Sequence, residues 1–247
     1  MRQGLKEVQI SRMASCALRG RMSSAEKAVA IVGASFPDAI DCFGLDQKVL
    51  LLAERDGFRP PAAKPYYRPL QEPVLASHWD RLVQLNFDAK QACEIASLLV
   101  GARQEIRSRP MVGRALDGSI FTFAKKPNAE WIDKLKFCTN QAEGPIELAA
   151  RLFQAIVYEH PFTDGNGRFS RALIYGALGS FGLISNPCLG LNGIFEIHRH
   201  TMALALQRCR SEDSLETLME ALTKMLEDSI KFINVLLARS CAALPLS

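Results

Sequence analysis

A run of twelve residues, from His160 to Arg171, holds most of the side chains in this sequence that could do chemistry. It reads His-Pro-Phe-Thr-Asp-Gly-Asn-Gly-Arg-Phe-Ser-Arg. A histidine has an ordinary pKa near ~6.5, so His160 is suited to take a proton from an attacking hydroxyl near neutral pH. Phosphate would repel Asp164 unless a divalent cation lay between them, and Mg²⁺ is commonly held in this way.

The second half of the run has the composition of an anion site. Gly165 and Gly167 flank Asn166 at the start of an expected helix, where glycine lets the backbone approach a bound group. Free amides and the positive helix end favour an anion there. Arg168 and Arg171 lie three residues apart, so both can offer forked donors to phosphate oxygens. Together these residues predict nucleotide phosphoryl chemistry.

Each of these features has an ordinary explanation when it stands alone. A histidine at a helix end is often a structural hydrogen-bonding group, an Asp-Gly-Asn-Gly string is often a plain turn, and arginines at a helix start are often solvated. Here every role in phosphate transfer is filled within one short run. We therefore favour the functional interpretation.

Two helices are expected to position the run. Pro145 opens the first helix, and an apolar stripe over 146–157 leads to His160, where Pro161 must end the helix. Phe162 is expected to pack inward and anchor the loop. The second helix is expected to begin about Arg168 and to reach Gly182.

The remaining pattern is also largely helical, so the fold class is mainly α. Apolar spacing predicts one long helix, or two short ones with a break at Asn86, over 79–106. Further helices are expected over 131–137, 194–209 and 215–237. Asp-Gly between short apolar runs predicts a β-hairpin over 114–123.

The chain divides into three expected segments. Residues 1–72 are an N-terminal, partly helical extension that ends in a proline-rich linker over 59–69, residues 73–238 form the main domain, and residues 239–247 are a C-terminal tail.

Composition excludes several classes of protein. A chain of 247 residues can bury a sizeable core, and its seven scattered cysteines form no Cys-x-x-Cys pair, which is typical of a cytoplasmic protein with reduced thiols. A net charge of +4 with interspersed signs does not indicate nucleic acid. No apolar stretch reaches the length of a membrane span, and no signal peptide is expected. Delivery into another cell is not readable from the sequence.

The run resembles the signature of the Fic family, His-x-Phe-x-Asp/Glu-Gly-Asn-Gly-Arg-x-x-Arg, and matches it at every fixed position. The flanking pattern is more loosely similar over 73–237. The resemblance implies a Fic-type helical bundle with a small β-hairpin flap. It also implies a protein adenylyltransferase with ATP as co-substrate and Mg²⁺ as cofactor. His160 would deprotonate a Ser, Thr or Tyr hydroxyl of a target protein, which attacks the α-phosphate of ATP, and Asp164 would hold the Mg²⁺.

The resemblance also implies which groups hold the nucleotide. Asn166, with the amides of Gly165 and Gly167, would steady the transferred phosphate, while Arg168 would contact the α- and β-phosphates and Arg171 the γ-phosphate. The flap would pair with an extended segment of the target. Its expected docking residues are Ser119, Ile120, Phe121, Thr122 and Phe123. An ordinary edge hairpin is the alternative.

Many relatives carry an inhibitory glutamate that pairs with the second arginine of the run. Residues 139–144 fit the inhibitory pattern, but Glu143 lies about 20 Å from the loop if the intervening residues are helical. Glu227 lacks the following Gly or Asn. We therefore expect no such glutamate on Arg171, and a separate inhibitory protein would be the restraint if there is one.

Two other functions stay open. The first is transfer of another phosphate-linked group, such as UMP or phosphocholine, because the loop says little about the base. The second is a catalytically idle module that binds partners through the flap.

Overall fold

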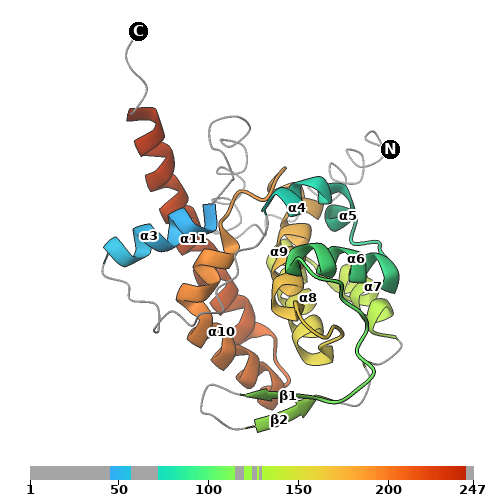
Figure 1. The fold of residues 1–247 in the computed structure, drawn as a ribbon. Helices are drawn as coiled ribbons and strands as arrows, with labels where there is room; N and C mark the ends of the chain where they lie inside the picture. Colours follow the sequence, from blue (N-terminus) through green and yellow to red (C-terminus); the bar gives the residue numbers. More distant parts are fainter. Residues whose placement is uncertain (1–44, 57–71, 115–119, 124–126, 128–129, 243–247) are drawn as a thin grey trace.

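The computed structural model describes residues 45–56, 72–114, 120–123, 127 and 130–242. Within these ranges the chain has nine helices and one two-stranded antiparallel sheet, which confirms the expected mainly α class (Figure 1). The helices are α3 (Leu45–Arg55), α4 (Glu72–Ser77), α5 (Trp79–Gln84), α6 (Ala89–Val100), α7 (Trp131–Gln141), α8 (Pro145–Glu159), α9 (Asn166–Ser180), α10 (Leu191–Glu212) and α11 (Glu216–Ala242). The strands are β1 (Met111–Arg114) and β2 (Ile120–Phe123).

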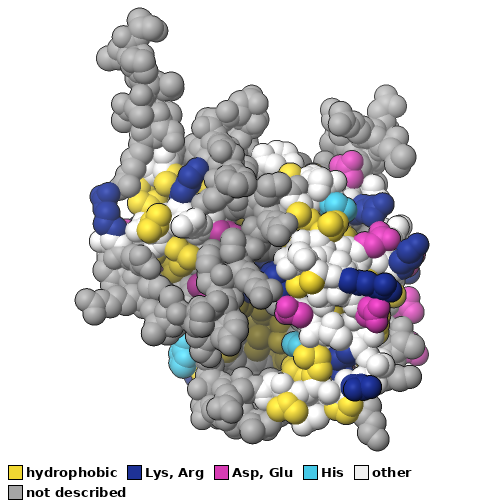
Figure 2. Space-filling model, in the orientation of Figure 1, with side chains coloured by type: hydrophobic (Ala, Val, Ile, Leu, Met, Phe, Trp, Pro, Cys, Tyr) yellow, Lys and Arg dark blue, Asp and Glu magenta, His cyan; other side chains and the backbone are white. Residues whose placement is uncertain are grey.

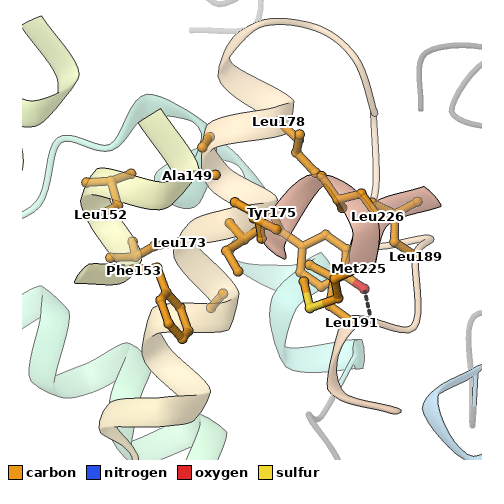
Figure 3. Packing of buried hydrophobic residues seen from close by; sticks show 14 of the residues in the cluster. Ala149, Leu152, Phe153, Leu173, Tyr175, Leu178, Leu189, Leu191, Met225 and Leu226 are labelled. Carbon is orange, nitrogen blue, oxygen red and sulfur yellow. Dashed lines mark hydrogen bonds between the residues drawn. The ribbon is translucent and has the colours of Figure 1, made fainter. Parts of the chain in front are cut away.

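Helices α8 and α9 form the centre of the bundle. They pack along each other, with α6 and α7 on one side and α10 and α11 on the other (Figure 1). Every residue of α9 except Gly167 is buried, and after Arg171 the helix is apolar or small on all faces. Figure 3 shows Tyr175 of α9 directed toward Met225 of α11, and the Tyr175 hydroxyl accepts a hydrogen bond of 3.1 Å from the Leu191 amide.

Two glycines let α5 approach α9 closely. A Cβ added at Gly176 would lie 2.5 Å from the carbonyl oxygen of Leu82. At Gly179 it would lie 2.6 Å from Val83 and 2.8 Å from Trp79. These distances are shorter than van der Waals contact, so any larger residue would push the two helices apart.

Helix α3 packs on α10 and α11 and shares their hydrophobic core. Asp46 is buried, and its Oδ1 accepts hydrogen bonds from the amides of Asn192 (2.9 Å) and Gly193 (3.1 Å) at the start of α10. A carboxylate there satisfies amides that have no partner inside the helix and opposes the helix dipole. The described part of the expected N-terminal extension is thus joined to the bundle. The proline-rich linker lies outside the described residues.

Most helix ends lie near their expected positions. Of the two alternatives for residues 79–106, the structure has two helices with a break around Asn86, where Leu85 is left-handed (φ 50°) and Asp88 forms a capping box with Gln91 at the start of α6. Helix α9 begins at Asn166 rather than about Arg168. Helix α7 extends to Gln141, past the expected end at residue 137. Helix α10 begins at Leu191, before the expected start at residue 194. Helix α11 continues to Ala242, past the expected end at Leu237.

The hairpin is present, although its first strand lies further upstream than expected. β1 and β2 pair with Met111 opposite Phe123 and Val112 opposite Thr122. The expected Asp-Gly turn and Ser119 lie outside the described residues.

We expect Gly176→Ala to destabilise the fold by about 1–3 kcal/mol, because the new methyl group would meet the backbone of α5. In an open helix the same change would stabilise by up to about 1 kcal/mol. Urea unfolding followed by circular dichroism measures the change. Thr201→Ala, at an exposed position of α10, is the control. A stabilised Gly176→Ala variant would show that α5 does not pack as described.

Candidate functional site

The loop between α8 and α9 is held by its own asparagine. The Asn166 Oδ1 accepts from the Phe162 amide (2.9 Å), and its Nδ2 donates to the Phe162 carbonyl (2.8 Å). Both residues are buried. The Phe162 ring packs edge-on against Trp131 and Phe169, which confirms its expected role as the anchor. Asn166 therefore shapes the loop, and its contact with a phosphate stays a prediction.

His160 lies at the C-terminal end of α8 in the left-handed conformation, with φ 46° and ψ 57°. This backbone is uncommon for a residue other than glycine, and it turns the chain sharply before Pro161. The His160 ring stacks on Phe123 of β2, with 4.0 Å between ring centroids and 17° between planes. The flap thus contacts the expected base directly.

Burial and then the positive charge of Arg107 lower the pKa of His160 from 6.5 to about 4, against opposing effects of the Val157 backbone and Asp164. The imidazole is therefore neutral at neutral pH, which is the state a general base needs. A bound triphosphate would add negative charge nearby and raise this pKa.

The first turn of α9 is exposed at Gly167, whereas Asn166 and Arg168 are buried. Gly165 precedes this turn with φ 82°, and the helix has no side-chain cap. The first amides of a helix have no partner within it, so this turn can receive an anion. Gly167 is exposed, and a Cβ added there would meet only the Nη1 of Arg171, at 3.4 Å. The Arg171 guanidinium thus lies beside Gly167, and its central carbon lies over the ring of Phe195 in α10, 4.7 Å from the ring centroid.

The Arg168 guanidinium contacts the end of α6 and Asp164 of the loop. It donates to the carbonyl of Leu99 (3.1 Å) and to the Oδ2 of Asp164 (3.1 Å). The Asp164 side chain is 61% exposed, and its Oδ1 accepts from the Gly165 amide at 2.6 Å. In this structure Arg168 orients the carboxylate, and its contact with phosphates stays a prediction.

Asp164 has the chemistry that Mg²⁺ needs. Among the described residues, no three His, Cys, Asp or Glu side chains gather into a metal-binding group. A single exposed carboxylate still fits, because Mg²⁺ is usually bound by one or two carboxylates together with waters and substrate phosphates. The residues present therefore fit an ion that arrives with a nucleotide.

The segment between α6 and β1 supports the loop, which was not expected from the sequence. The Gln104 Oε1 accepts from the Asp164 amide and from the Thr163 hydroxyl, both at 2.9 Å. Ile106 forms a β-bridge with Phe162. Arg107 contacts the backbone at the end of α8. No motif or spacing connects these residues to the run, so only the fold could show them.

The expected docking residues of the flap and the two candidate inhibitory glutamates lie in different parts of the structure. Thr122 and Phe123 lie on β2, with Thr122 exposed, while Ser119 is outside the described residues. Fifteen residues of α8 separate Glu143 from His160. Glu227 lies on an exposed face of α11. The absence of an inhibitory glutamate stays a prediction.

The charged side chains on one face of the molecule are of mixed sign. On the face that Figure 2 shows, Lys and Arg side chains are interspersed with Asp and Glu over α5, α6 and α7. Such mixed charge gives no broad attractive field for a polyanion. Among the described helices, none is both long and apolar enough to cross a bilayer.

A sequence model described as the Fic/DOC family matches residues 86–178, which include the whole run from His160 to Arg171. Residues 86–178 of this chain are therefore similar to the Fic/DOC family. Two solved structures also align with it. A Fic family protein from Desulfovibrio desulfuricans is 15% identical with a TM-score of 0.48, over 96% of this chain and 75% of that one. A Fic domain containing signalling protein from Bacteroides thetaiotaomicron is 16% identical with a TM-score of 0.49, over 96% and 97%. No curated protein matches this chain.

We expect Gln104→Leu to lower the free energy of unfolding by about 1–3 kcal/mol, because the Asp164 amide would lose its buried acceptor. Gln141→Leu applies the same change at the exposed end of α7 and should stay within about 0.5 kcal/mol of wild type. Urea unfolding of both variants measures the difference. Equal losses in both variants would show that Gln104 does not stabilise the loop between α8 and α9.

Acid should destabilise the domain partly through His160. The unfolded chain binds a proton near pH 6.5, but the folded chain binds it only near pH 4. Stability therefore falls as pH drops through this window. His160→Gln should reduce the fall between pH 7 and pH 4.5, measured by urea unfolding. His200→Gln, at an exposed position, should leave it unchanged. The pKa of buried His198 is also lowered, but neither variant alters it. An unchanged fall in His160→Gln would contradict the expectation.

Proposed function

We propose that the Fic domain transfers AMP from ATP to a Ser, Thr or Tyr hydroxyl of a target protein. One observation carries the proposal. A neutral, half-buried histidine and an uncapped helix N-terminus with an arginine beside it are held in one short loop by Asn166. A proton acceptor and an anion site on one loop match transfer of a phosphate-linked group to a hydroxyl.

Each residue has a defined part in the reaction. His160 accepts the proton of the target hydroxyl. The hydroxyl oxygen then bonds to the α-phosphorus as the bond to the bridging oxygen of the β-phosphate breaks, and pyrophosphate leaves. The amides at the start of α9 donate to the phosphate oxygens, where charge develops in the transition state. Arg171 binds the terminal phosphate beside Gly167. Mg²⁺ held by Asp164 would neutralise phosphate charge when bound.

The flap gives the target hydroxyl its position. β2 ends at Phe123, whose ring stacks on His160, so a segment paired with the flap would pass next to the base. Main-chain pairing accepts many sequences and sets only the register of the bound segment.

The decisive experiment follows radioactive label on the protein itself or on lysate proteins in the presence of Mg²⁺. We expect label from α-labelled ATP and none from γ-labelled ATP. His160→Ala should lower labelling by about 100-fold or more, the usual effect of losing a general base. His200→Ala is the matched control at an exposed position.

Other outcomes would identify other reactions. Stronger labelling by α-labelled UTP would indicate UMP transfer, and labelling by CDP-choline carrying a labelled choline would indicate phosphocholine transfer. No label from any donor, with flap-dependent capture of a partner, would indicate the catalytically idle module. Label that persists in His160→Ala would show that His160 is not the base.

A further inference from the structure

The end of α8 leaves backbone carbonyls that the helix itself cannot satisfy. Glu159 is its last residue, and His160 follows in the left-handed conformation with Pro161 after it. The direction of the His160 side chain depends on this turn, because its Cβ is fixed by the backbone of the same residue. Whatever holds these carbonyls therefore also orients the imidazole.

Arg107 binds three consecutive carbonyls at this turn. Its Nη2 donates to the carbonyl of Glu159 (3.0 Å), its Nε donates to that of His160, and its backbone amide donates to that of Pro161 (2.9 Å). The Arg107 Nη1 donates to its own segment, at the carbonyl of Arg109 (3.2 Å). The residue is only 3% exposed. A planar guanidinium has its donors in a rigid fork, so this set of bonds allows one backbone geometry.

Arg107 also lies next to the ring that supports the imidazole. Its guanidinium carbon is 5.8 Å from the centroid of Phe123, and Phe123 stacks on His160. The same positive group faces the negative end of the α8 dipole, where a cation is favoured. The backbone and the ring of His160 are thus both in contact with groups that Arg107 holds.

We propose that Arg107 is a positioning residue that fixes the orientation of the His160 imidazole in the active site through the carbonyls at the end of α8. This role rests on the proposed function of His160 as the base. Arg107 does not itself touch the reacting atoms. A simple helix cap would also use these bonds, but it would affect only stability.

The test compares three variants of the full chain. Arg107→Met removes the fork, and Arg107→Lys keeps a positive charge that cannot bridge adjacent carbonyls in the same way. Arg109→Met is the control, because Arg109 is exposed in the same segment and accepts the Arg107 hydrogen bond through its backbone carbonyl.

The first readout needs no activity. The chain has four histidines, so the His160 imidazole proton can be assigned in NMR spectra as the signal lost in His160→Ala. Stacking on Phe123 should shift this signal upfield in wild type and in Arg109→Met. It should move toward the position of an unstacked ring in Arg107→Met and Arg107→Lys. Unchanged signals in both Arg107 variants would overturn the proposal, whether or not the protein transfers AMP.

The second readout is the labelling reaction at several ATP concentrations. We expect kcat to fall about 10- to 100-fold in both Arg107 variants while KM for ATP changes less than about threefold, since small displacements of a catalytic group mainly slow the chemical step. A melting curve measures the folded fraction, and a loss of stability with unchanged kcat would show a helix cap alone. If Arg107→Met does not fold, Arg107→Lys decides the question. Absence of labelling in wild type would count against the proposed function only, and the NMR result would still decide the role of Arg107.

Discussion

The reversal of the chain between α8 and α9 is the constraint on which the site depends. Both helices are largely buried, so the short segment that joins them runs against the core and its backbone polar groups need internal partners. Asn166 satisfies both backbone groups of Phe162, and the burial of Phe162 prevents the segment from moving outward. The chemical groups then lie on the outer side of a loop whose inner side is fixed.

A second segment, between α6 and β1, completes this support. It supplies an acceptor for the Asp164 amide from Gln104 and three donors for the end of α8 from Arg107. These contacts join residues more than fifty positions apart, so they form only when the bundle has folded. A site supported in this way is preorganised, and little free energy is needed to arrange it when substrate binds.

The same burial determines the electrostatics. His160 lies against Phe123 and near Arg107, and both the loss of solvent and the positive charge favour the neutral imidazole. The two left-handed positions of the loop, His160 and Gly165, lie at the end of α8 and immediately before the start of α9. Uncommon backbone geometry at His160 persists because the surrounding bonds hold it, which is typical of functional sites.

The sequence by itself determined which side chains the loop carries and the local elements around them. The run from His160 to Arg171, the end of α8 before Pro161, the inward Phe162 and the hairpin all follow from residue type and short-range spacing, because backbone sterics and helical periodicity act over a few residues. Only the tertiary structure decided that Asn166 clamps Phe162, that Arg168 turns toward Asp164, and that Gln104 and Arg107 support the loop. Only the fold placed Asp46 at the start of α10. These contacts depend on which surfaces meet when the helices pack, and no periodicity along the chain encodes that meeting.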